Sequence, residues 1–249
     1  MRVRRLIVNA DDFGLTRGVS EGILAAHRNG IVTSTTVLVN RPVAPSLLER
    51  LIASGIGVGL HLNLTLGAPI TRAPSLTGSD GRFIRDPRQA AARARPDDVE
   101  REIEAQIQAF QRLLGRAPTH LDTHHHAGLL PPVGAIVLGL ARRRGLAVRS
   151  QNEAARAAAR TAGLRTPDHF FGESGPDAHW TVARTLGRLR RLPTGCSEFM
   201  THPGYFDDEL AYSRYGRQRE TELIGVGSPV ARAAVEALGI RLADFRSLA

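Results

Sequence analysis

The chain has 249 residues, of which 42% are hydrophobic and 23% are charged, and its formal net charge is +9. This length suits one α/β barrel, and no apolar run approaches the roughly 18 residues that a membrane span needs. All 33 basic residues are arginines, but they are scattered, and only 5% of the residues are aromatic. A nucleic-acid-binding protein would cluster its basic residues with aromatics. We therefore expect neither nucleic acid nor a membrane among its partners.

The single cysteine, Cys196, excludes an internal disulfide and a zinc cluster built on cysteines. A lone cysteine is usually an inert buried hydrophobe, so we do not expect a nucleophile here. It fits a reducing compartment, and no cleavable apolar segment precedes the first expected strand, so we expect a cytoplasmic protein. The basic composition is compatible with a monomer or a homodimer.

Strand-like and helix-like segments alternate along the first half of the chain. We expect strands at 4–10, 31–40 and 56–65, helices at 18–30 and 44–55, and a long loop at 67–97. The clearest helix is 97–115, which we expect Asp97 to cap and Gly115 to end.

The second half continues the alternation. We expect strands at 117–126, 146–150 and 197–205 and helices at 133–145, 179–191, 207–224 and 228–238, the last capped by Ser228, whereas 151–177 has no clear pattern. Repeated βα units give a doubly wound parallel sheet or a barrel. Because no G-x-G-x-x-G or P-loop occurs, nucleotide-binding versions lose support. No repeat or linker marks a second domain, so we expect one α/β domain over 1–249.

Polar side chains collect at the ends of four expected strands, and successive strand residues face opposite ways. The sets that share a face are Asn9 and Asp11; His61, Asn63 and Thr65; His120, Asp122, His124 and His126; and Glu198, Met200 and His202. In α/β barrels the active site lies at the C-terminal ends of the strands. A lone histidine such as His61 is more often a satisfied buried side chain, whereas the run at 124–126 favours a metal site over a solvated turn.

Asp11 and Asp12 stand side by side where the first strand ends. Two carboxylates this close in a partly desolvated site need a cation, or one of them must hold a proton. An Asp-capped turn is the alternative. Together with the histidines they indicate a metal site, because imidazole and carboxylate ligands from different strands can converge. One aspartate and two histidines leave room for a water whose pKa a divalent ion lowers, and the second aspartate remains available as a general base.

Five ordered motifs, "LIVNADDFG", "GIVTSTTVLVN", "GLHLNLT", "PTHLDTHHH" and "THPGY", resemble those of the YdjC-like carbohydrate deacetylases, which include the chitooligosaccharide deacetylases. The resemblance implies a single-domain (β/α) barrel-like fold related to polysaccharide deacetylases. It also implies a divalent metal, usually Mg²⁺, with Zn²⁺ or another ion as alternatives. The implied reaction is hydrolysis of an N-acetyl group from an amino-sugar oligosaccharide such as diacetylchitobiose.

The resemblance further implies roles for individual residues. The metal ligands would be Asp12, His61 and His124. Asp11 would be the general base, and His202 would be the acid that protonates the leaving amine. Gly128 stands where family members often carry a further histidine, a departure that leaves the metal triad intact and bears on a substrate contact.

Several residues near the motifs have two interpretations. Arg149 orients Asp11 or binds the sugar, or it is a plain surface arginine. The 67–97 loop closes over the sugar, or it is an exposed excursion. Phe13 and Tyr205 stack on a sugar ring, or they pack in the wall. The sequence assigns no role to the remaining polar residues of the fourth expected strand, His120, Asp122, His125 and His126.

The sequence also fits other functions. One is a metal-dependent hydrolase of another acylated glycan, a glycolipid or a phosphoester. The phosphoester case favours two metals about 4 Å apart, and it requires Asp122 to join a second site. Another is a non-catalytic sugar- or metal-binding protein, which would not need Asp11.

Overall fold

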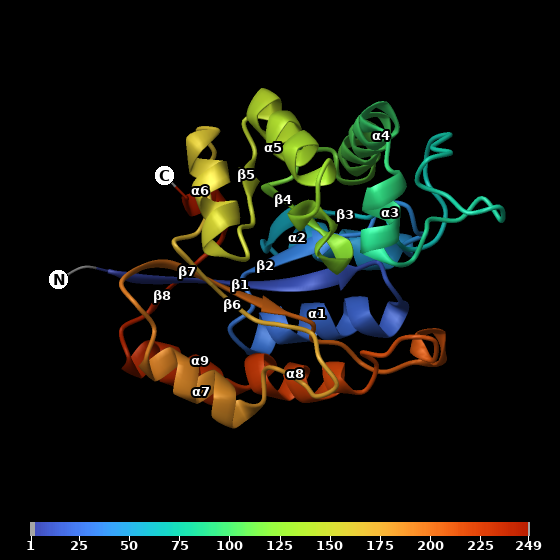
Figure 1. Cartoon of the computed structure of the whole chain (residues 1–249). Helices are drawn as coiled ribbons and strands as arrows, with labels where there is room; N and C mark the ends of the chain where they lie inside the picture. The colour runs from blue at the N-terminus through green and yellow to red at the C-terminus, as the bar shows by residue number, and fades with distance from the viewer. Residues whose placement is uncertain (1–2, 249) are drawn as a thin grey trace. The chain divides into compact units, whose positions relative to one another are not determined.

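The computed structural model describes residues 3–248. Contacts divide the chain into two compact units, one of Met1–Thr36, Val43–Gly57 and Pro167–Ala249 and the other of Val37–Pro42 and Val58–Thr166. The strands follow the order β5-β4-β3-β2-β1-β7-β6, and β8 pairs with β1 (Figure 1). The prediction of a single domain over 1–249 stays a prediction.

Parallel strands organise the first unit. β1 (Arg4–Phe13) pairs with β7 (Gly195–Thr201) and, over Arg5–Ile7, with β8 (Arg241–Ala243). β6 (His169–Phe171) pairs with the other edge of β7. β2 (Ser34–Val37) belongs to this unit as far as Thr36. In the β1–β7 register Asn9 faces Met200 and Ala10 faces Thr201. Parallel strands in register end at the same edge of the sheet. Asp11, which follows Ala10, and His202, which follows Thr201, therefore both lie at that edge.

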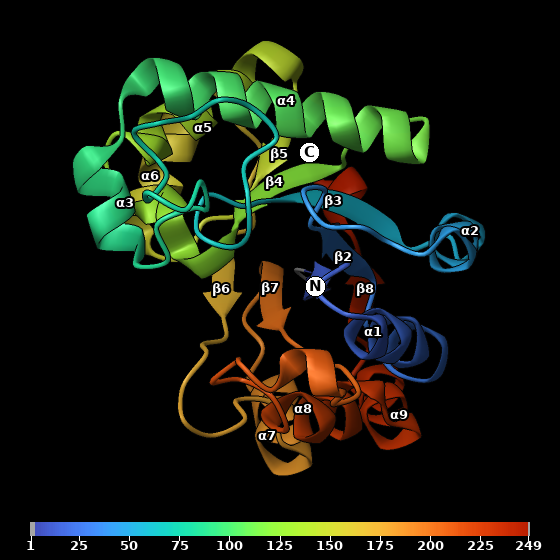
Figure 2. The ribbon, with the colours of Figure 1, turned by 90° about the vertical axis from the view of Figure 1, so that its right-hand side faces the viewer.

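The helices of the first unit are α1 (Arg17–Asn29), α2 (Pro45–Ala53), α7 (Val182–Arg190), α8 (Gln218–Gly227) and α9 (Pro229–Ala237). Helix α1 contacts α8 and α2, and α7 contacts α8 and α9 (Figure 2). Helix α1 also lies against the turn after β7, where a Cβ on Gly22 would be 2.5 Å from the Cα of Gly204. Only glycine permits this approach, which holds the turn carrying His202 against the helix.

The second unit repeats the parallel pattern with β3 (Gly57–Leu62), β4 (His120–Thr123) and β5 (Ala147–Val148). Its helices are α3 (Pro87–Arg93), α4 (Pro96–Leu114), α5 (Val133–Arg144) and α6 (Glu153–Thr161), with a 3₁₀ segment η1 (His124–Leu129) after β4. Helix α4 packs against α5 (Figure 2). Its buried residues include Val99, Ile103, Ile107 and Phe110, a spacing that puts one apolar stripe towards the core.

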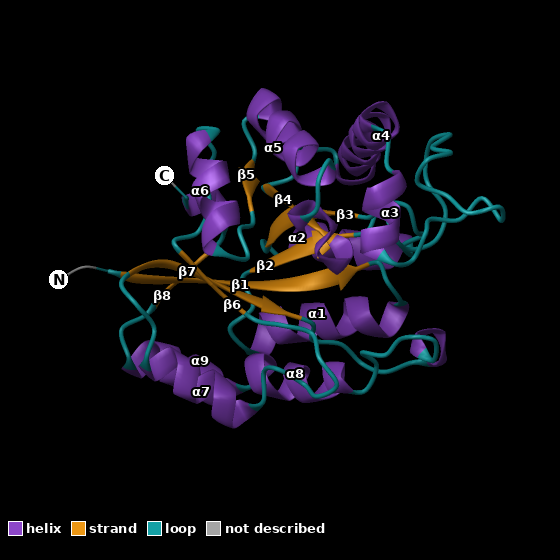
Figure 3. Cartoon of the chain, viewed as in Figure 1, coloured by secondary structure: helices purple, strands orange, loops and turns teal. Residues whose placement is uncertain are grey.

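The irregular part of the segment expected as a loop at 67–97 is shorter than expected, and hydrogen bonds fix it to α4. Residues 87–93 form α3, and the irregular part before it is the long loop stretch that precedes α3 in Figure 3. The fully buried Glu102 of α4 accepts hydrogen bonds from the backbone of Ile70 and from the backbone and hydroxyl of Thr71. Asp98 accepts two more from Ser75. Buried, multiply hydrogen-bonded carboxylates of this kind fix the start of the segment to α4.

Other expected boundaries were wrong for local reasons. Helix α4 begins at Pro96, with Arg95 at the N-cap and no side-chain cap, so Asp97 lies in the first turn instead. Proline is favoured at the first helical position because its fixed φ suits the helix. The N–H that it lacks would have no partner within the helix at that position. The strand expected at 31–40 shrinks to β2, and the helix expected at 207–224 becomes a 3₁₀ turn at Asp208–Leu210 followed by α8.

Two helix ends follow the expectation. Gly115 ends α4 in the left-handed conformation, and the Ser228 side chain caps α9. Residues 151–177, which had no clear pattern, contain α6 and β6. Within residues 3–248, every helix is too short or too polar to cross a membrane.

Candidate active site

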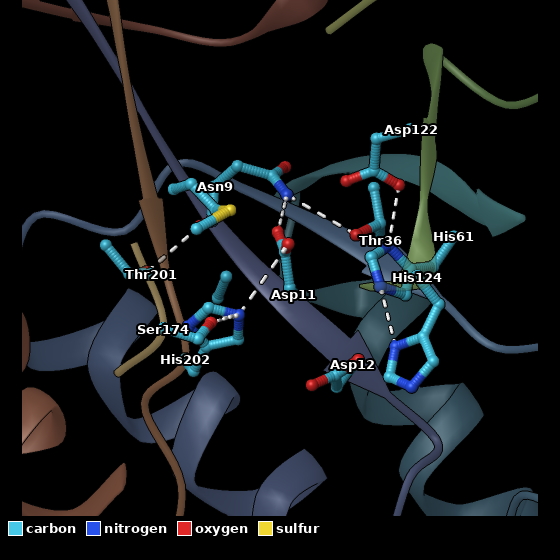
Figure 4. Close-up of polar contacts among 12 residues, drawn as sticks. Asn9, Asp11, Asp12, Thr36, His61, Asp122, His124, Ser174, Thr201 and His202 are labelled. Atoms are coloured by element: carbon cyan, nitrogen blue, oxygen red, sulfur yellow. Dashed lines mark hydrogen bonds and ion pairs between the residues drawn. The ribbon is translucent and has the colours of Figure 1, made fainter. Parts of the chain in front are cut away.

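Asp11 lies in the buried end of β1 and is held by its own strand. Asn9 Nδ2 donates a hydrogen bond of 2.8 Å to Asp11 Oδ1 (Figure 4). The other oxygen, Asp11 Oδ2, lies 4.0 Å from His202 Nε2. Both side chains are at most 10% exposed. A carboxylate and an imidazole, brought to one place by the β1–β7 register, form a candidate pair for moving protons.

Asp12 has an unusual backbone conformation for a strand residue. Its φ is +76°, in the left-handed region that disfavours residues other than glycine. Its Oδ2 accepts a hydrogen bond of 2.7 Å from Arg219 Nη2, and both side chains are buried. Strain of this kind persists only where the surroundings enforce it, and such residues cluster at functional sites. Here it turns Asp12 away from the regular alternation that governs Asn9 and Asp11.

In the second unit, His61 and His124 bring two ring nitrogens together. His61 Nε2 lies 3.2 Å from His124 Nδ1 (Figure 4). The opposite nitrogen, His61 Nδ1, lies 2.7 Å from Asp122 Oδ1. Asp122 Oδ2 in turn lies 2.8 Å from Arg149 Nη1, so Arg149 is a buried ion-pair partner rather than a surface residue. Because the Asp122 carboxylate accepts the hydrogen bond from Nδ1–H, Nε2 is the nitrogen with the free lone pair. Carboxylates hydrogen-bonded to metal-bound histidines act in the same way.

The histidines after His124 do not continue the strand. β4 ends at Thr123, and both His125 (φ +52°) and His126 (φ +57°) are left-handed. The expectation that His124 and His126 share a strand face is therefore wrong, because the alternation stops where the chain turns into η1. His125 Nδ1 lies 3.0 Å from Thr65 Oγ1.

Gly128 closes this turn. Its N–H donates a hydrogen bond of 2.9 Å to Thr123 Oγ1, and a Cβ at this position would lie 3.0 Å from the Thr123 side chain. The glycine thus fits a tight turn that a larger residue would have to displace.

The structure gives three other residues packing roles. The fully buried ring of His120 lies where a Cβ on Gly59 would be, 2.3 Å from its Cε1, so the glycine makes room for it. Phe13 is fully buried, which excludes stacking on a sugar, whereas Tyr205 is 45% exposed. Cys196 is buried in β7, and burial raises the pKa of its thiol to about 11, as expected for an inert cysteine.

Among residues 3–248, buried aspartates and histidines supply a candidate site for a divalent metal ion. The sequence model of the YdjC-like protein family matches residues 5–237. The chain belongs to this family. The resemblance in the motifs is therefore confirmed.

The YdjC-like chain has relatives that match almost its full length. It is 39% identical over 247 residues to a carbohydrate deacetylase of Geobacillus stearothermophilus, a match that covers 98% of this chain and 97% of the relative. It is 38% identical over 253 residues to a chitooligosaccharide deacetylase of Salmonella paratyphi B, with 97% and 98% covered.

Solved structures agree on the fold of this YdjC-like protein. A proposed cellobiose-phosphate cleavage protein of Enterococcus faecalis V583 is 31% identical, with a TM-score of 0.88 and 98% of each chain covered. The Xyl-CE4 domain of a multidomain xylanase from the hindgut metagenome of Trinervitermes trinervoides is 9% identical, with a TM-score of 0.55, 97% of this chain and 87% of that chain covered. The expected α/β, barrel-like fold class is confirmed.

Two buried charged residues of this YdjC-like chain, Arg219 and Glu222, lie outside every motif of the sequence. Arg219 is 3% exposed, and Glu222 is fully buried. They are three positions apart on α8 and therefore share a helix face. The stretch "RQRETELIG" contains so many charges that it suggests a solvated helix. Only their long-range partners mark them as part of the site.

We expect Asp122→Asn to weaken metal binding about 10–100-fold, the usual loss when a partner of a metal-bound histidine is removed. The amide has one acceptor oxygen for both His61 and Arg149, so the His61 tautomer is no longer fixed. Calorimetric titration with Zn²⁺ and Mg²⁺ measures the affinity. Asp177→Asn, which changes an exposed aspartate, is the control. Unchanged affinity in Asp122→Asn would contradict the assignment of Asp122.

Proposed function

We propose that this YdjC-like protein is a metal-dependent carbohydrate deacetylase that removes N-acetyl groups from amino-sugar oligosaccharides such as diacetylchitobiose. The names of the two relatives support this activity and this class of substrate. The observation that carries the proposal is the buried pair of Asp11 and His202, with Asp11 Oδ2 and His202 Nε2 4.0 Å apart. Amide hydrolysis needs a base for the attacking water and an acid for the leaving nitrogen, and this pair supplies both.

We propose that Asp12, His61 and His124 hold the metal ion, because the resemblance of the motifs that contain them to those of the YdjC-like family implies these ligands. One carboxylate oxygen and two imidazole nitrogens are a fitting donor set for a divalent ion. Imidazole suits Zn²⁺, whereas Mg²⁺, which the family resemblance implies, prefers oxygen, so both ions belong in the test. When bound, such an ion polarises a carbonyl group and lowers the pKa of a water molecule.

The residues of the chain then divide the proton transfers. Asp11, oriented by Asn9, takes a proton from the attacking water. His202 gives the proton on Nε2 to the amide nitrogen as its bond to the acyl carbon breaks. The products are acetate and the free amine. Arg219 holds one oxygen of Asp12, so the strained aspartate keeps its orientation when substrate enters.

The contacts of Asp122 argue against the phosphoesterase alternative. A second metal ion would need Asp122 as a ligand. The two oxygens of Asp122 already lie 2.7 Å from His61 Nδ1 and 2.8 Å from Arg149 Nη1. We also propose the cytoplasm as the location, because the one buried cysteine suits a reducing compartment.

Acetate release from diacetylchitobiose tests the function. The protein is stripped of metal and assayed with no addition, with Mg²⁺ and with Zn²⁺. Metal-dependent release of acetate supports the proposal. An arm with acetylated xylan distinguishes an amide substrate from an ester. No acetate from diacetylchitobiose or other N-acetylated sugars under any metal condition would overturn the proposed substrate class.

A further inference from the structure

Glu222 is a fully buried carboxylate at the centre of several backbone segments. Its Oε2 accepts the backbone N–H of His202 at 2.5 Å, and its Oε1 accepts that of His179 at 3.1 Å. Oε1 also accepts the hydroxyl of Tyr215. Burial raises the pKa of Glu222, and the hydrogen bonds from Tyr215 and from the backbone oppose this rise. Because all these partners donate, they favour a carboxylate that carries its charge.

His202 lies between this carboxylate and Asp11. Glu222 Oε2 is 4.0 Å from His202 Nδ1, and Asp11 Oδ2 is 4.0 Å from His202 Nε2. The ring therefore has one carboxyl group near each nitrogen. Opposite charges at about this range favour the charged form of a histidine. An imidazolium is the form in which His202 can donate a proton from Nε2.

We propose that Glu222 is a positioning residue. It holds the turn that contains His202 by accepting the backbone N–H of His202, and its carboxylate near Nδ1 favours the imidazolium form of the ring. The inference rests on the proposed function, since it gives His202 the role of acid. Glu222 itself touches no reacting atom. Its effect reaches the substrate through the orientation and charge of the ring.

Four segments place groups beside the His202 ring. Asp11 comes from β1, Glu222 from α8, Tyr215 from the turn before α8, and Ser174 from the segment after β6. The Tyr215 ring centroid is 5.3 Å from that of His202, and Ser174 Oγ is 3.4 Å from Nε2. Burial and the adjacent Glu222 raise the pKa of Tyr215, so its phenol stays neutral. The positive charge of Arg219, also on α8, is paired with Asp12 at 2.7 Å.

Glu222→Gln in the full-length protein tests the proposal, because glutamine keeps the shape and removes the charge. We expect kcat to fall about tenfold to about a hundredfold, part of the 10²–10⁴ that general acid catalysis supplies, with KM almost unchanged. We also expect the alkaline limb of the kcat profile to move to lower pH by on the order of one unit, because the imidazolium loses a nearby negative charge. Glu236→Gln, at an exposed position of α9, is the control and leaves both unchanged.

A ¹⁵N spectrum of the histidine rings is independent of activity, with the His202 signals assigned by comparison with His202→Gln. In the wild type we expect both His202 nitrogens to be protonated at neutral pH. A neutral His202 ring would overturn the proposal, even if Glu222→Gln does not fold. A folded Glu222→Gln with wild-type kcat and pH profile would also overturn it. If the wild type releases no acetate, the proposed function fails, and the ring spectrum still decides the role of Glu222.

Discussion

Asp11→Asn should abolish nearly all acetate release while the protein still binds metal. General base catalysis typically contributes a factor of about 10²–10⁴, so we expect kcat to fall by that range. The physical reason is that an amide cannot take a proton from water, whereas the Asp11 carboxylate, fixed by Asn9 at 2.8 Å, is poised to do so. Acetate release from diacetylchitobiose, measured at saturating substrate, gives kcat directly.

Measuring the metal affinity distinguishes the proposed base, Asp11, from the proposed ligand, Asp12. In Asp11→Asn we expect the dissociation constant for the metal ion to stay within a few-fold of the wild-type value, because Asp11 is not assigned as a ligand. A loss of metal binding comparable to that of a ligand variant would show that Asp11 coordinates the ion, and the assignment of base and ligand would then be reversed. Asp177→Asn, exposed on the surface, controls for the loss of one negative charge.

His124→Ala should strongly weaken metal binding and, as a consequence, acetate release. His124 Nδ1 faces His61 Nε2 at 3.2 Å, so the variant deletes one of two converging donors. We expect the affinity to fall by about a hundredfold or more, at or beyond the upper end of the loss seen when only an outer partner is removed. Calorimetry with Zn²⁺ and Mg²⁺ measures binding, and the acetate assay measures the consequence. His124 is a better choice than Asp12, because removing Asp12 would leave the buried Arg219 without its carboxylate and destabilise the fold.

The matched control is His169→Ala. His169 lies in β6, and its ring interacts with the carbonyl of Thr194 rather than with other histidines. We expect metal affinity and acetate release to stay at wild-type values in this variant. If His124→Ala still bound metal as tightly as His169→Ala does, His124 would not be a ligand.

Local patterns in the sequence determined the fold class, two helix ends and the residues proposed for the chemistry. Alternation of strands and helices gave the α/β class, and the helix ends at Gly115 and Ser228 follow from backbone and capping preferences that act over a few residues. The residues proposed for the chemistry, Asp11 and His202 among them, were found because polar side chains at strand ends are conspicuous in an apolar context. These features depend on near neighbours along the chain, which the sequence displays directly.

Only the tertiary structure decided which charged residues support that chemistry. Arg219 reaches Asp12 across 207 positions of the chain, and Glu222 bonds the backbone of His202 across 20. On the sequence both look like surface charges of an ordinary helix. The structure also separated His120, which packs against Gly59, from His124, whose ring nitrogen meets that of His61. Residue type and spacing determine what a side chain can do, whereas its burial and its partners are determined by segments that meet only in the fold.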